Sequence, residues 1–287
     1  MAMTINTNVN SLTAQRNAIT TQNSLAVSMQ RLSSGLRVNS ARDDAAGLAI
    51  ADRMNTQVRG MNVAIRNAND GISLAQVAEG GLSVMGDMLQ RMRELAVQAI
   101  NSTNTTGAAG DLGALNQEFT QLRDEVNRTM SAVQFNGTSL FITTADFAFQ
   151  VGANSGQTIT ISGAALNIND ATGGMSGVTQ GAGAASALSI TTNAANSAVL
   201  VALDTALSTI NATRATLGAV QSRFENTINY LRTVVENQSA ARGRIMDADF
   251  AAETSNLSRA QILQQAGTAM IAQANQLPQG VLRLLQG

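Results

Sequence analysis

The stretch VLVALDTALSTINATRATLGAVQSRFENTINYLRTV, residues 199–234, carries apolar side chains at alternating spacings of four and three residues. Such spacing is typical of a helix that packs against another helix along a narrow seam. A helix of this length spans roughly 50 Å at 1.5 Å per residue, which is too long for burial inside one small globule. The stretch therefore predicts an elongated, mainly helical fold. Its seam positions are Val199, Leu203, Ala206, Ile210, Thr213, Leu217, Val220, Phe224, Thr227, Leu231 and Val234.

Three further segments show the same spacing, one before the centre of the chain and one at each end. The first is Leu112, Leu115, Phe119, Leu122, Val126, Thr129 and Val133. The C-terminal series is Ala260, Leu263, Gly267, Met270, Ala274, Leu277, Val281 and Leu284. The N-terminal series slips by one residue after its fourth member and comprises Ile5, Val9, Leu12, Ile19, Leu25, Met29, Leu32 and Leu36.

Residues 61–99 also have helical periodicity, with two apolar stripes that predict packing on two sides. The stripes are Met61, Ile65, Ala68, Ile72 and Ala75, and then Val77, Val84, Met88 and Leu95. The turn-forming sequence NSTNTTGAAG, residues 101–110, predicts the end of this helix.

In the middle of the chain the helical periodicity gives way to strand-like patterns. FAFQVG and QTITISG read as short strands on either side of ANSG, residues 153–156, and predict a β-hairpin. Residues 171–187 are rich in Gly, Ala and Ser, which indicates an exposed connection. With helices at both ends, we expect a mainly α fold, a long antiparallel coiled-coil rod with a small β-hairpin-containing region in mid-chain.

The composition excludes most catalytic chemistry. The chain has no His and no Cys, and all 18 members of its Lys+Arg count are Arg. Catalytic triads, zinc sites with His or thiolate ligands, Schiff bases and phosphate-binding P-loops are therefore absent. We expect no enzyme activity, no cofactor and no metal.

The charge of the chain also limits its partners. With a formal net charge of −1 and 3% aromatic residues, neither nucleic acid nor an anionic membrane is an expected partner. The start MAMTINTNVNSL has no basic or apolar signal region, so we expect no cleavable signal peptide, and if the protein is exported it leaves by another route. Two charge-free stretches, residues 171–203 and 260–282, are too polar for membrane spans.

The two ends of the chain nearly lack charge. Arg16 is the one charged residue among the first 30, and Arg283 is the one among residues 260–287. Surface helices of a monomer normally carry charge on their outer face, whereas uncharged polar residues are cheaper to bury when hydrogen-bonded. The ends therefore predict burial by other copies of the same chain, in an open, repeating assembly. We expect them to be poorly ordered before assembly.

The sequence LSSGLRVNSARDDAAGLAI, residues 32–50, places two arginines and two aspartates between glycines, and ARGRIMDADFA, residues 241–251, forms a counterpart. A metal or catalytic role for the adjacent aspartates is disfavoured, because neighbouring side chains diverge on a helix. We expect a connector in which the two clusters form Arg–carboxylate pairs. The residues concerned are Arg37, Arg42, Asp43, Asp44, Arg242, Arg244, Asp247 and Asp249.

Four stretches of the chain resemble a known protein family. LSSGLRVNSARDDAAGLAIADRM near one end and NLSRAQILQQAGTAMIAQANQLPQGVLRLL at the other are similar to bacterial flagellin, as are INTNVNSL and QFNGTSL. The resemblance covers about the first 140 and the last 90 residues. It implies a subunit of the flagellar filament, exported unfolded by the flagellar type III apparatus and added beneath a filament cap.

The resemblance also implies a domain organisation. Residues 1–33 and 253–287 would form an inner tube, and residues 34–46 and 240–252 would form spoke connectors. Residues 47–133 and 195–239 would form the helical core domain, with residues 134–194 as its small β-rich part. For self-assembly it points to Ile5, Val9, Leu12, Ile19, Leu25, Met29, Leu32, Leu263, Met270, Leu277, Val281 and Leu284.

Several partners follow from the resemblance. LQRMRELAVQ, residues 89–98, resembles the segment that Toll-like receptor 5 detects, with Gln90, Arg91, Leu95, Gln98 and Glu118 at matching positions. These residues also suit packing between subunits, and both roles are compatible. The uncharged C-terminal helix suits a groove in a secretion chaperone or in a cytosolic innate receptor. Cap and hook-filament junction proteins are the remaining expected partners.

Three alternatives are weighed against this interpretation. A hook-filament junction protein has the same helical ends but forms a short ring. An inserted metalloprotease would need HExxH, and the chain has no His. A sugar-binding β region is disfavoured by one Tyr and no Trp.

Overall fold

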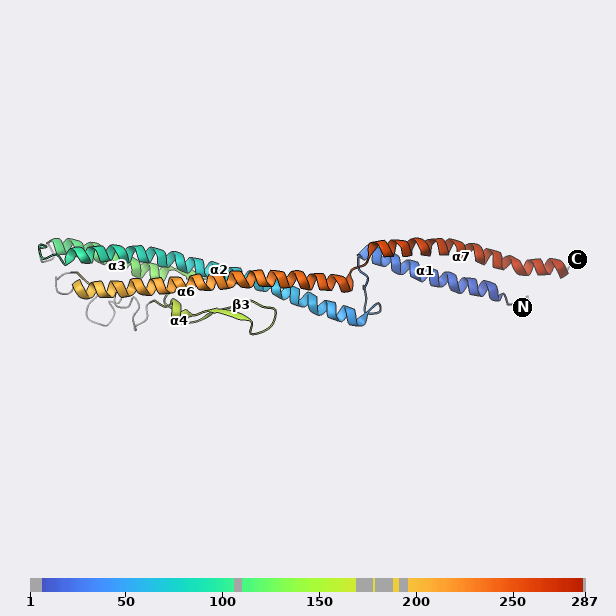
Figure 1. Cartoon of the computed structure of the whole chain (residues 1–287), viewed down its shortest axis with the longest axis horizontal. Helices are drawn as coiled ribbons and strands as arrows, with labels where there is room; N and C mark the ends of the chain where they lie inside the picture. The colour runs from blue at the N-terminus through green and yellow to red at the C-terminus, as the bar shows by residue number, and fades with distance from the viewer. Residues whose placement is uncertain (1–6, 106–109, 169–177, 179–187, 191–195, 286–287) are drawn as a thin grey trace. The chain divides into compact units, whose positions relative to one another are not determined.

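The computed structural model describes residues 7–105, 110–168, 178, 188–190 and 196–285, with the side chains of 196 and 277–285 left out of the description. The chain folds as two compact units, Met1–Val58 with Glu236–Gly287 and Arg59–Val235. The fold is mainly α, as the sequence predicts (Figure 1). The long helices are α1 (Val9–Ser34), α2 (Ala45–Ala99), α3 (Asp111–Ala132), α6 (Asn196–Met246) and α7 (Phe250–Leu285).

In the second unit, Arg59–Val235, α2 runs antiparallel to α6. Near the end of α2, Arg93 Nε lies 2.7 Å from Asp204 Oδ1, which belongs to the first part of α6. Glu79 lies earlier in α2, and its Oε1 is 3.8 Å from Nη2 of Arg214, which lies later in α6. The predicted seam of α6 is confirmed. Its buried members are Val199, Leu203, Ala206, Ile210, Thr213, Leu217, Phe224 and Leu231.

The seam of α2 differs from the two predicted stripes. Its buried residues follow one continuous alternation of three and four residues, and many of them are small. Val77 and Val84, assigned to the second stripe, are exposed instead. Alanine and glycine conceal the true seam in the sequence, because hydrophobic periodicity is carried mainly by bulky side chains. The seam is Met61, Ala64, Ala68, Gly71, Ala75, Ala78, Leu82, Met85, Leu89, Met92, Ala96 and Ala99.

Two antiparallel hairpins follow α3. The first pairs β1 (Gln134–Phe135) with β2 (Thr138–Ser139) through Asn136 and Gly137, whose positive φ angles of 49° and 78° suit a tight hairpin turn. The second is the hairpin that the sequence predicts, and it pairs β3 (Phe147–Gln150) with β4 (Thr158–Ile161).

The second hairpin packs on the helices of its unit. Phe149 meets the ring of Phe224 edge-on at 5.7 Å, and Asn67 Nδ2 donates to the carbonyl of Gln150 at 3.0 Å. The short α4 (Gly163–Leu166) follows. Of the connection expected over residues 171–187, only Val178 is described, and its side chain is buried; the rest lies outside the described residues.

In the first unit, α1 and α7 pack antiparallel along most of their length (Figure 1). Asn8, the N-cap of α1, donates from Nδ2 to the carbonyl of Ala274 at 2.8 Å, whereas Arg31 at the other end of α1 approaches Glu253 at 3.8 Å. Ser11 Oγ donates to Asn275 Oδ1 at 2.8 Å. The side chains between the helices are mostly small or polar, namely Ser11, Ala14, Ala18, Thr21, Leu25, Ser28 and Leu32 of α1, and Ala260, Gln264, Gly267, Ile271 and Ala274 of α7.

The connector between α1 and α2 is held by the backbone of residues 245–248. Gly35 ends α1 in the left-handed conformation, with φ 72°, and Leu36 pairs with Asp247 in an antiparallel bridge. The N–H of Arg37 donates to the carbonyl of Met246 at 2.6 Å. Val38 is fully buried in a small core with Ala51 and Met246.

Only parts of the predicted spoke segments, residues 34–46 and 240–252, lie outside the long helices. Residues 35–44 separate α1 from α2, but only residues 247–249 separate α6 from α7. The predicted segment over residues 240–252 is therefore helical up to Met246 and again from Phe250. Its sequence before Asp247 has no proline, and its one glycine is tolerated within a helix.

Candidate assembly surface

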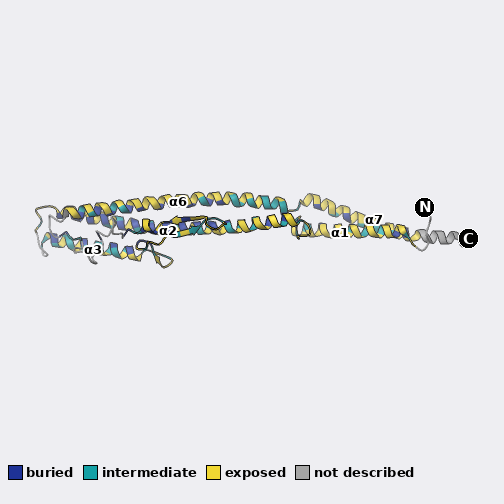
Figure 2. Ribbon diagram, turned by 90° about the horizontal axis from the view of Figure 1, so that it is seen from below, coloured by how far each residue is buried: buried dark blue, intermediate teal, exposed yellow. Residues whose placement is uncertain are grey.

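The helix pair of α1 and α7 turns large apolar side chains toward solvent. Leu12 and Ile19 of α1 are 57% and 59% exposed, and Ile262 and Met270 of α7 are 65% and 61% exposed. Both helices are mostly exposed in Figure 2, unlike the buried inner faces of α2 and α3. On a folded monomer such an accumulation of apolar surface is typical of an interaction site.

The exposed apolar residues of α1 lie on both flanks of its contact with α7. Leu12, Ile19 and Met29 each follow a seam residue, namely Ser11, Ala18 and Ser28, and so project to one flank. Val27 precedes Ser28 and projects to the other flank. The pair therefore offers apolar surface on two sides.

A groove runs along the Val27 flank. It consists of two adjoining hollows of about 810 and 610 Å³, which share Asn17, Thr21 and Leu263 in their walls. Val27, Leu263 and Met270 supply the exposed apolar part, and the remaining wall residues are mainly Asn, Thr, Ser and Ala. The groove thus has an apolar strip bordered by uncharged hydrogen-bonding groups.

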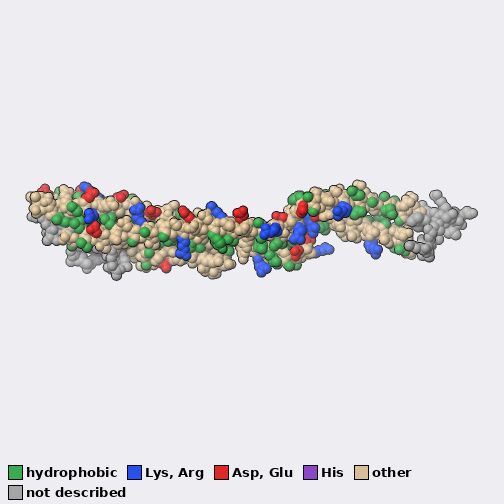
Figure 3. Space-filling model, in the orientation of Figure 1, with side chains coloured by type: hydrophobic (Ala, Val, Ile, Leu, Met, Phe, Trp, Pro, Cys, Tyr) green, Lys and Arg blue, Asp and Glu red, His purple; other side chains and the backbone are tan. Residues whose placement is uncertain are grey.

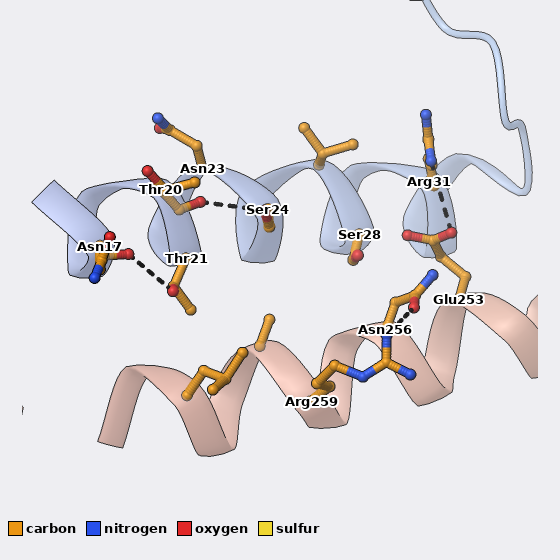
Figure 4. A pocket seen from close by; sticks show the side chains of 13 residues that line it. Asn17, Thr20, Thr21, Asn23, Ser24, Ser28, Arg31, Glu253, Asn256 and Arg259 are labelled. Carbon is orange, nitrogen blue, oxygen red and sulfur yellow. Dashed lines mark hydrogen bonds and ion pairs between the residues drawn. The ribbon is translucent and has the colours of Figure 1, made fainter. Parts of the chain in front are cut away.

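Charged side chains gather at the connector end of the groove (Figure 4). Arg31 faces Glu253, whose side chain is 10% exposed, and Arg259 donates to Asn256 Oδ1 at 3.3 Å. Farther along, Figure 3 shows a surface of α1 and α7 that is mostly green and tan. The low charge that the sequence indicates is thus a property of the exposed surface itself.

The predicted assembly residues fall into three groups. Val9, Leu12, Ile19, Met29, Leu263 and Met270 are exposed, whereas Leu25 and Leu32 are half-buried at the seam. Ile5 lies outside the described residues, as do the side chains of Leu277, Val281 and Leu284. The expected seam of α1 is therefore corrected. Val9, Leu12, Ile19 and Met29 point away from α7, whereas Leu25 and Leu32 join the smaller Ser11, Ala14, Ala18, Thr21 and Ser28 in the contact.

The ion pairs expected in the connector are also corrected. Within the described part of the chain, none of the arginines 37, 42, 242 and 244 lies within 4 Å of a carboxylate. Arg37 Nη2 donates instead to the carbonyl of Ile245 at 2.6 Å. Arg42, Arg242 and Arg244 form no ion pair or side-chain hydrogen bond among the described residues.

The aspartates of the connector accept hydrogen bonds from backbone N–H groups. Asp43 Oδ2 accepts from the N–H groups of Asn39 and Ser40 at 3.1 and 3.0 Å, and these bonds lower the pKa of the Asp43 carboxyl below its ordinary value. Asp44 accepts from Gly47 N at 2.8 Å at the start of α2. Asp249 accepts from Ala251 N at 2.9 Å at the start of α7. These carboxylates therefore stabilise a turn and the starts of α2 and α7, which is a structural role.

The segment considered for receptor binding belongs to α2, and its exposed residues lie on the outer face of that helix. Arg91 Nε donates to Glu118 Oε1 of α3 at 2.8 Å, and its Nη1 donates to Glu94 at 2.9 Å. These bonds to carboxylates raise the pKa of the Arg91 guanidinium. Gln90 and Gln98 are exposed beside it.

Leu95 does not share this exposure. Its side chain is 1% exposed, because it faces the core between the helices of the second unit. The expectation of a direct contact between Leu95 and a receptor is therefore corrected, because the side chain is buried within its own unit. Among the described residues there is also no group of three or more acidic side chains that could hold a metal ion, and no helix suited to crossing a membrane.

Comparison with known proteins gives consistent matches over both units. The family model of the bacterial flagellin N-terminal helical region matches residues 5–146, and that of the bacterial flagellin C-terminal helical region matches residues 200–285. Flagellin of Halalkalibacterium halodurans is 44% identical over 285 residues, which cover 99% of this chain and 100% of that protein. Flagellin of Bacillus subtilis is 40% identical over 310 residues, with 99% and 100% covered. A crystal structure of Bacillus cereus flagellin is 30% identical and covers 58% of this chain and 88% of that chain, with a TM-score of 0.48.

Proposed function

Because the chain belongs to the bacterial flagellin family, we propose that its copies join one another through the exposed apolar surfaces of α1 and α7. As a flagellin it is a structural subunit of the extracellular flagellar filament and not an enzyme. The observation that supports this route of assembly is the exposure of Leu12, Ile19, Ile262 and Met270 on a helix pair with few charges.

The energetic argument is direct. Full burial of one Leu, Ile or Met side chain contributes about 1.5–3 kcal/mol, so a few such residues suffice to hold a subunit in a repeating contact. The uncharged Asn, Thr and Ser residues along the groove can be buried beside them if each finds a hydrogen-bond partner. Apolar surface on two flanks suits a contact that repeats without closing.

The domain organisation follows the same logic. We infer that residues 1–33 and 253–287 form the inner tube, that residues 34–46 and 240–252 act as spokes, and that residues 47–133 and 195–239 form the outer helical layer. The small core around Val38 and the Leu36–Asp247 bridge support a connector of defined geometry. Copies of the chain would then meet through separate surfaces in each layer.

Export and partner binding complete the proposal. We infer that the chain is exported unfolded by the flagellar type III apparatus, with a secretion chaperone bound to its C-terminal helix. It is then added beneath the filament cap, above hook-filament junction proteins. A weakly charged helix with large apolar residues such as Ile262 and Leu263 exposed is suited to a chaperone groove.

Toll-like receptor 5 is the proposed host partner. The exposed Gln90, Arg91, Gln98 and Glu118 would provide the contact. Arg91 is held by Glu118 and Glu94, so it is ordered before binding. Ordered arginines at the centre of an interface are frequent sources of binding energy.

The decisive experiment is seeded polymerisation of purified, depolymerised protein, followed by electron microscopy. The full chain is compared with chains that lack residues 1–34 or 260–287. Long filaments from the full chain alone are expected. A full chain that stays monomeric would favour the alternative, a hook-filament junction protein, and polymerisation of either shortened chain would refute assembly through α1 and α7.

A further inference from the structure

The methionines of the described chain divide between core and surface. Met85 and Met92 are 0% exposed, whereas Met29 and Met270 are 52% and 61% exposed. Met61, Met130 and Met246 are also buried, and Met54 and Met88 are half-buried. Among the methionines with described side chains, Met29 and Met270 are therefore the two that are more than half exposed to solvent.

The two exposed methionines occupy opposite flanks of the helix pair. Met270 lines the groove beside Leu263 and Gly267, whereas Met29 follows the buried Ser28 and lies on the flank that carries Leu12 and Ile19. Each methionine belongs to an apolar surface of the unassembled subunit. A change in the polarity of either side chain would alter the surface around it.

We propose that Met29 and Met270 are oxidation sites of the unassembled subunit, and that their oxidation by a hydroperoxide blocks its addition to a filament. A lone pair of the thioether sulfur attacks one peroxide oxygen, the O–O bond breaks, and an S–O bond forms. The sulfur loses two electrons and the peroxide is reduced. The proton on the attacked oxygen passes to the second oxygen, which leaves as water from hydrogen peroxide or as an alcohol from an organic hydroperoxide. The product is a methionine sulfoxide, which is polar and chiral.

The inhibition follows from the new polarity. A sulfoxide oxygen buried against apolar side chains without a hydrogen-bond donor is costly, so the oxidised flank resists burial. Both flanks would be affected, because Met29 and Met270 lie on different sides of the pair. The inference rests on the proposed function in one respect, namely that other copies cover these flanks. It follows that subunits within a filament would be protected from the oxidant.

The test treats the unassembled full chain with hydrogen peroxide and follows each methionine by peptide mass mapping. Met29 and Met270 are expected to be oxidised roughly tenfold or more faster than Met85 and Met92, in line with their exposure. Oxidation of Met85 and Met92 at the same rate as Met29 and Met270 would overturn the site assignment.

The effect on assembly is measured by seeded elongation of the same samples. The variant Met29→Leu/Met270→Leu keeps side chains of similar volume and is compared with its own untreated sample, whose elongation rate peroxide treatment is expected to leave unchanged. Met85→Leu should lose as large a fraction of its own untreated rate as the original chain does. Reduction by a methionine sulfoxide reductase is expected to restore elongation of the oxidised original chain. Equal inhibition of the double variant and the original chain would refute the proposal.

An untreated sample separates this proposal from the proposed function. If untreated protein fails to elongate, the hook-filament junction alternative is favoured, and the oxidation proposal falls as well because there is no elongation to block. If untreated protein elongates and the sulfoxide form with both sites oxidised elongates equally well, only the oxidation proposal is refuted.

Discussion

Gly71 of α2 lies directly against the ring of Phe224 of α6, and a Cβ atom on Gly71 would stand 2.6 Å from the Cζ atom of that ring. The ring has little room to move, because it is fully buried and meets Phe149 of the second hairpin edge-on. Glycine at this position thus allows the two helices and the hairpin to meet at one point.

Replacement of Gly71 with alanine is therefore expected to destabilise the unit Arg59–Val235. Overpacking of a filled core typically costs about 1–3 kcal/mol, more than the roughly 1 kcal/mol gained in helix propensity. Gly80 of the same helix is the matched control, since a Cβ there would meet nothing within 4 Å. Urea unfolding followed by circular dichroism should show a lower midpoint for Gly71→Ala and an unchanged or higher one for Gly80→Ala. Equal midpoints would contradict the packing argument.

Replacement of Ile19 with serine is expected to weaken assembly while leaving the monomer intact. Ile19 is 59% exposed in the single chain, so its loss removes little internal packing. If another copy buries it, the loss of about 1.5–3 kcal/mol raises the critical concentration for polymerisation by roughly tenfold or more. Gln30→Ser, which alters an exposed polar residue of α1, should leave the critical concentration near its original value. An unaltered value for Ile19→Ser would remove this residue from the assembly surface.

Replacement of Asp43 with asparagine is expected to loosen the connector in a pH-dependent way. Hydrogen bonds from Asn39 N and Ser40 N lower the pKa of the folded carboxyl below 3.8. A lowered pKa means that the carboxylate stabilises the fold at neutral pH, and that this contribution is lost as pH falls through the folded value. Amide hydrogen exchange in residues 37–48 should be faster in Asp43→Asn than in the original chain at pH 7. The two should converge as pH falls below 3.8.

The matched control for this prediction is Asp52→Asn. Asp52 is exposed on α2, and its side chain forms no hydrogen bond or ion pair in the described chain. Its replacement should leave amide hydrogen exchange in residues 37–48 unchanged, both at pH 7 and below pH 3.8. A constant difference between Asp43→Asn and the original chain from pH 7 to about 2 would show that the carboxylate charge is not the stabilising factor.

Replacement of Arg91 with alanine is expected to reduce signalling through Toll-like receptor 5 by about tenfold or more, as for other interfacial arginines of this kind. Arg93 is a close control, because it is also an exposed, ion-paired arginine of α2 but bonds Asp204 of α6 rather than Glu118 of α3. Monomeric protein should be assayed on receptor-expressing cells, with circular dichroism as a check of folding. Similar potency of both variants would argue against Arg91 as a specific contact.

The helices made of bulky residues could be predicted well from the sequence. In α6 the spacing of Leu203, Ile210, Leu217 and Phe224 gives the buried face directly. In α1 the same reasoning selects residues that are exposed in the single chain, such as Leu12 and Ile19. Periodicity identifies side chains that avoid water, but it does not say whether they pack within the chain or against another copy.

The connector shows a second limit of sequence reasoning. Opposite charges at Arg37, Asp43 and Asp247 predict ion pairs, yet the structure uses Asp43 as an acceptor for backbone N–H groups and Arg37 as a donor to a backbone carbonyl. Short acidic side chains near a helix start commonly satisfy backbone donors. The choice between these partners depends on the backbone path, which residue types alone do not determine.

The small side chains between α1 and α7 also have a mechanical consequence. Residues such as Ser11, Ala18 and Gly267 form low ridges, so the helix axes can approach closely and few deep interlocking contacts oppose sliding of one helix along the other. We expect the part of the pair between its end contacts, Asn8–Ala274 and Arg31–Glu253, to be elastically soft along its axis, with small shifts between α1 and α7 at low energetic cost. A polymer that contains many such pairs can bend by sharing the change in length among them while every helix stays intact.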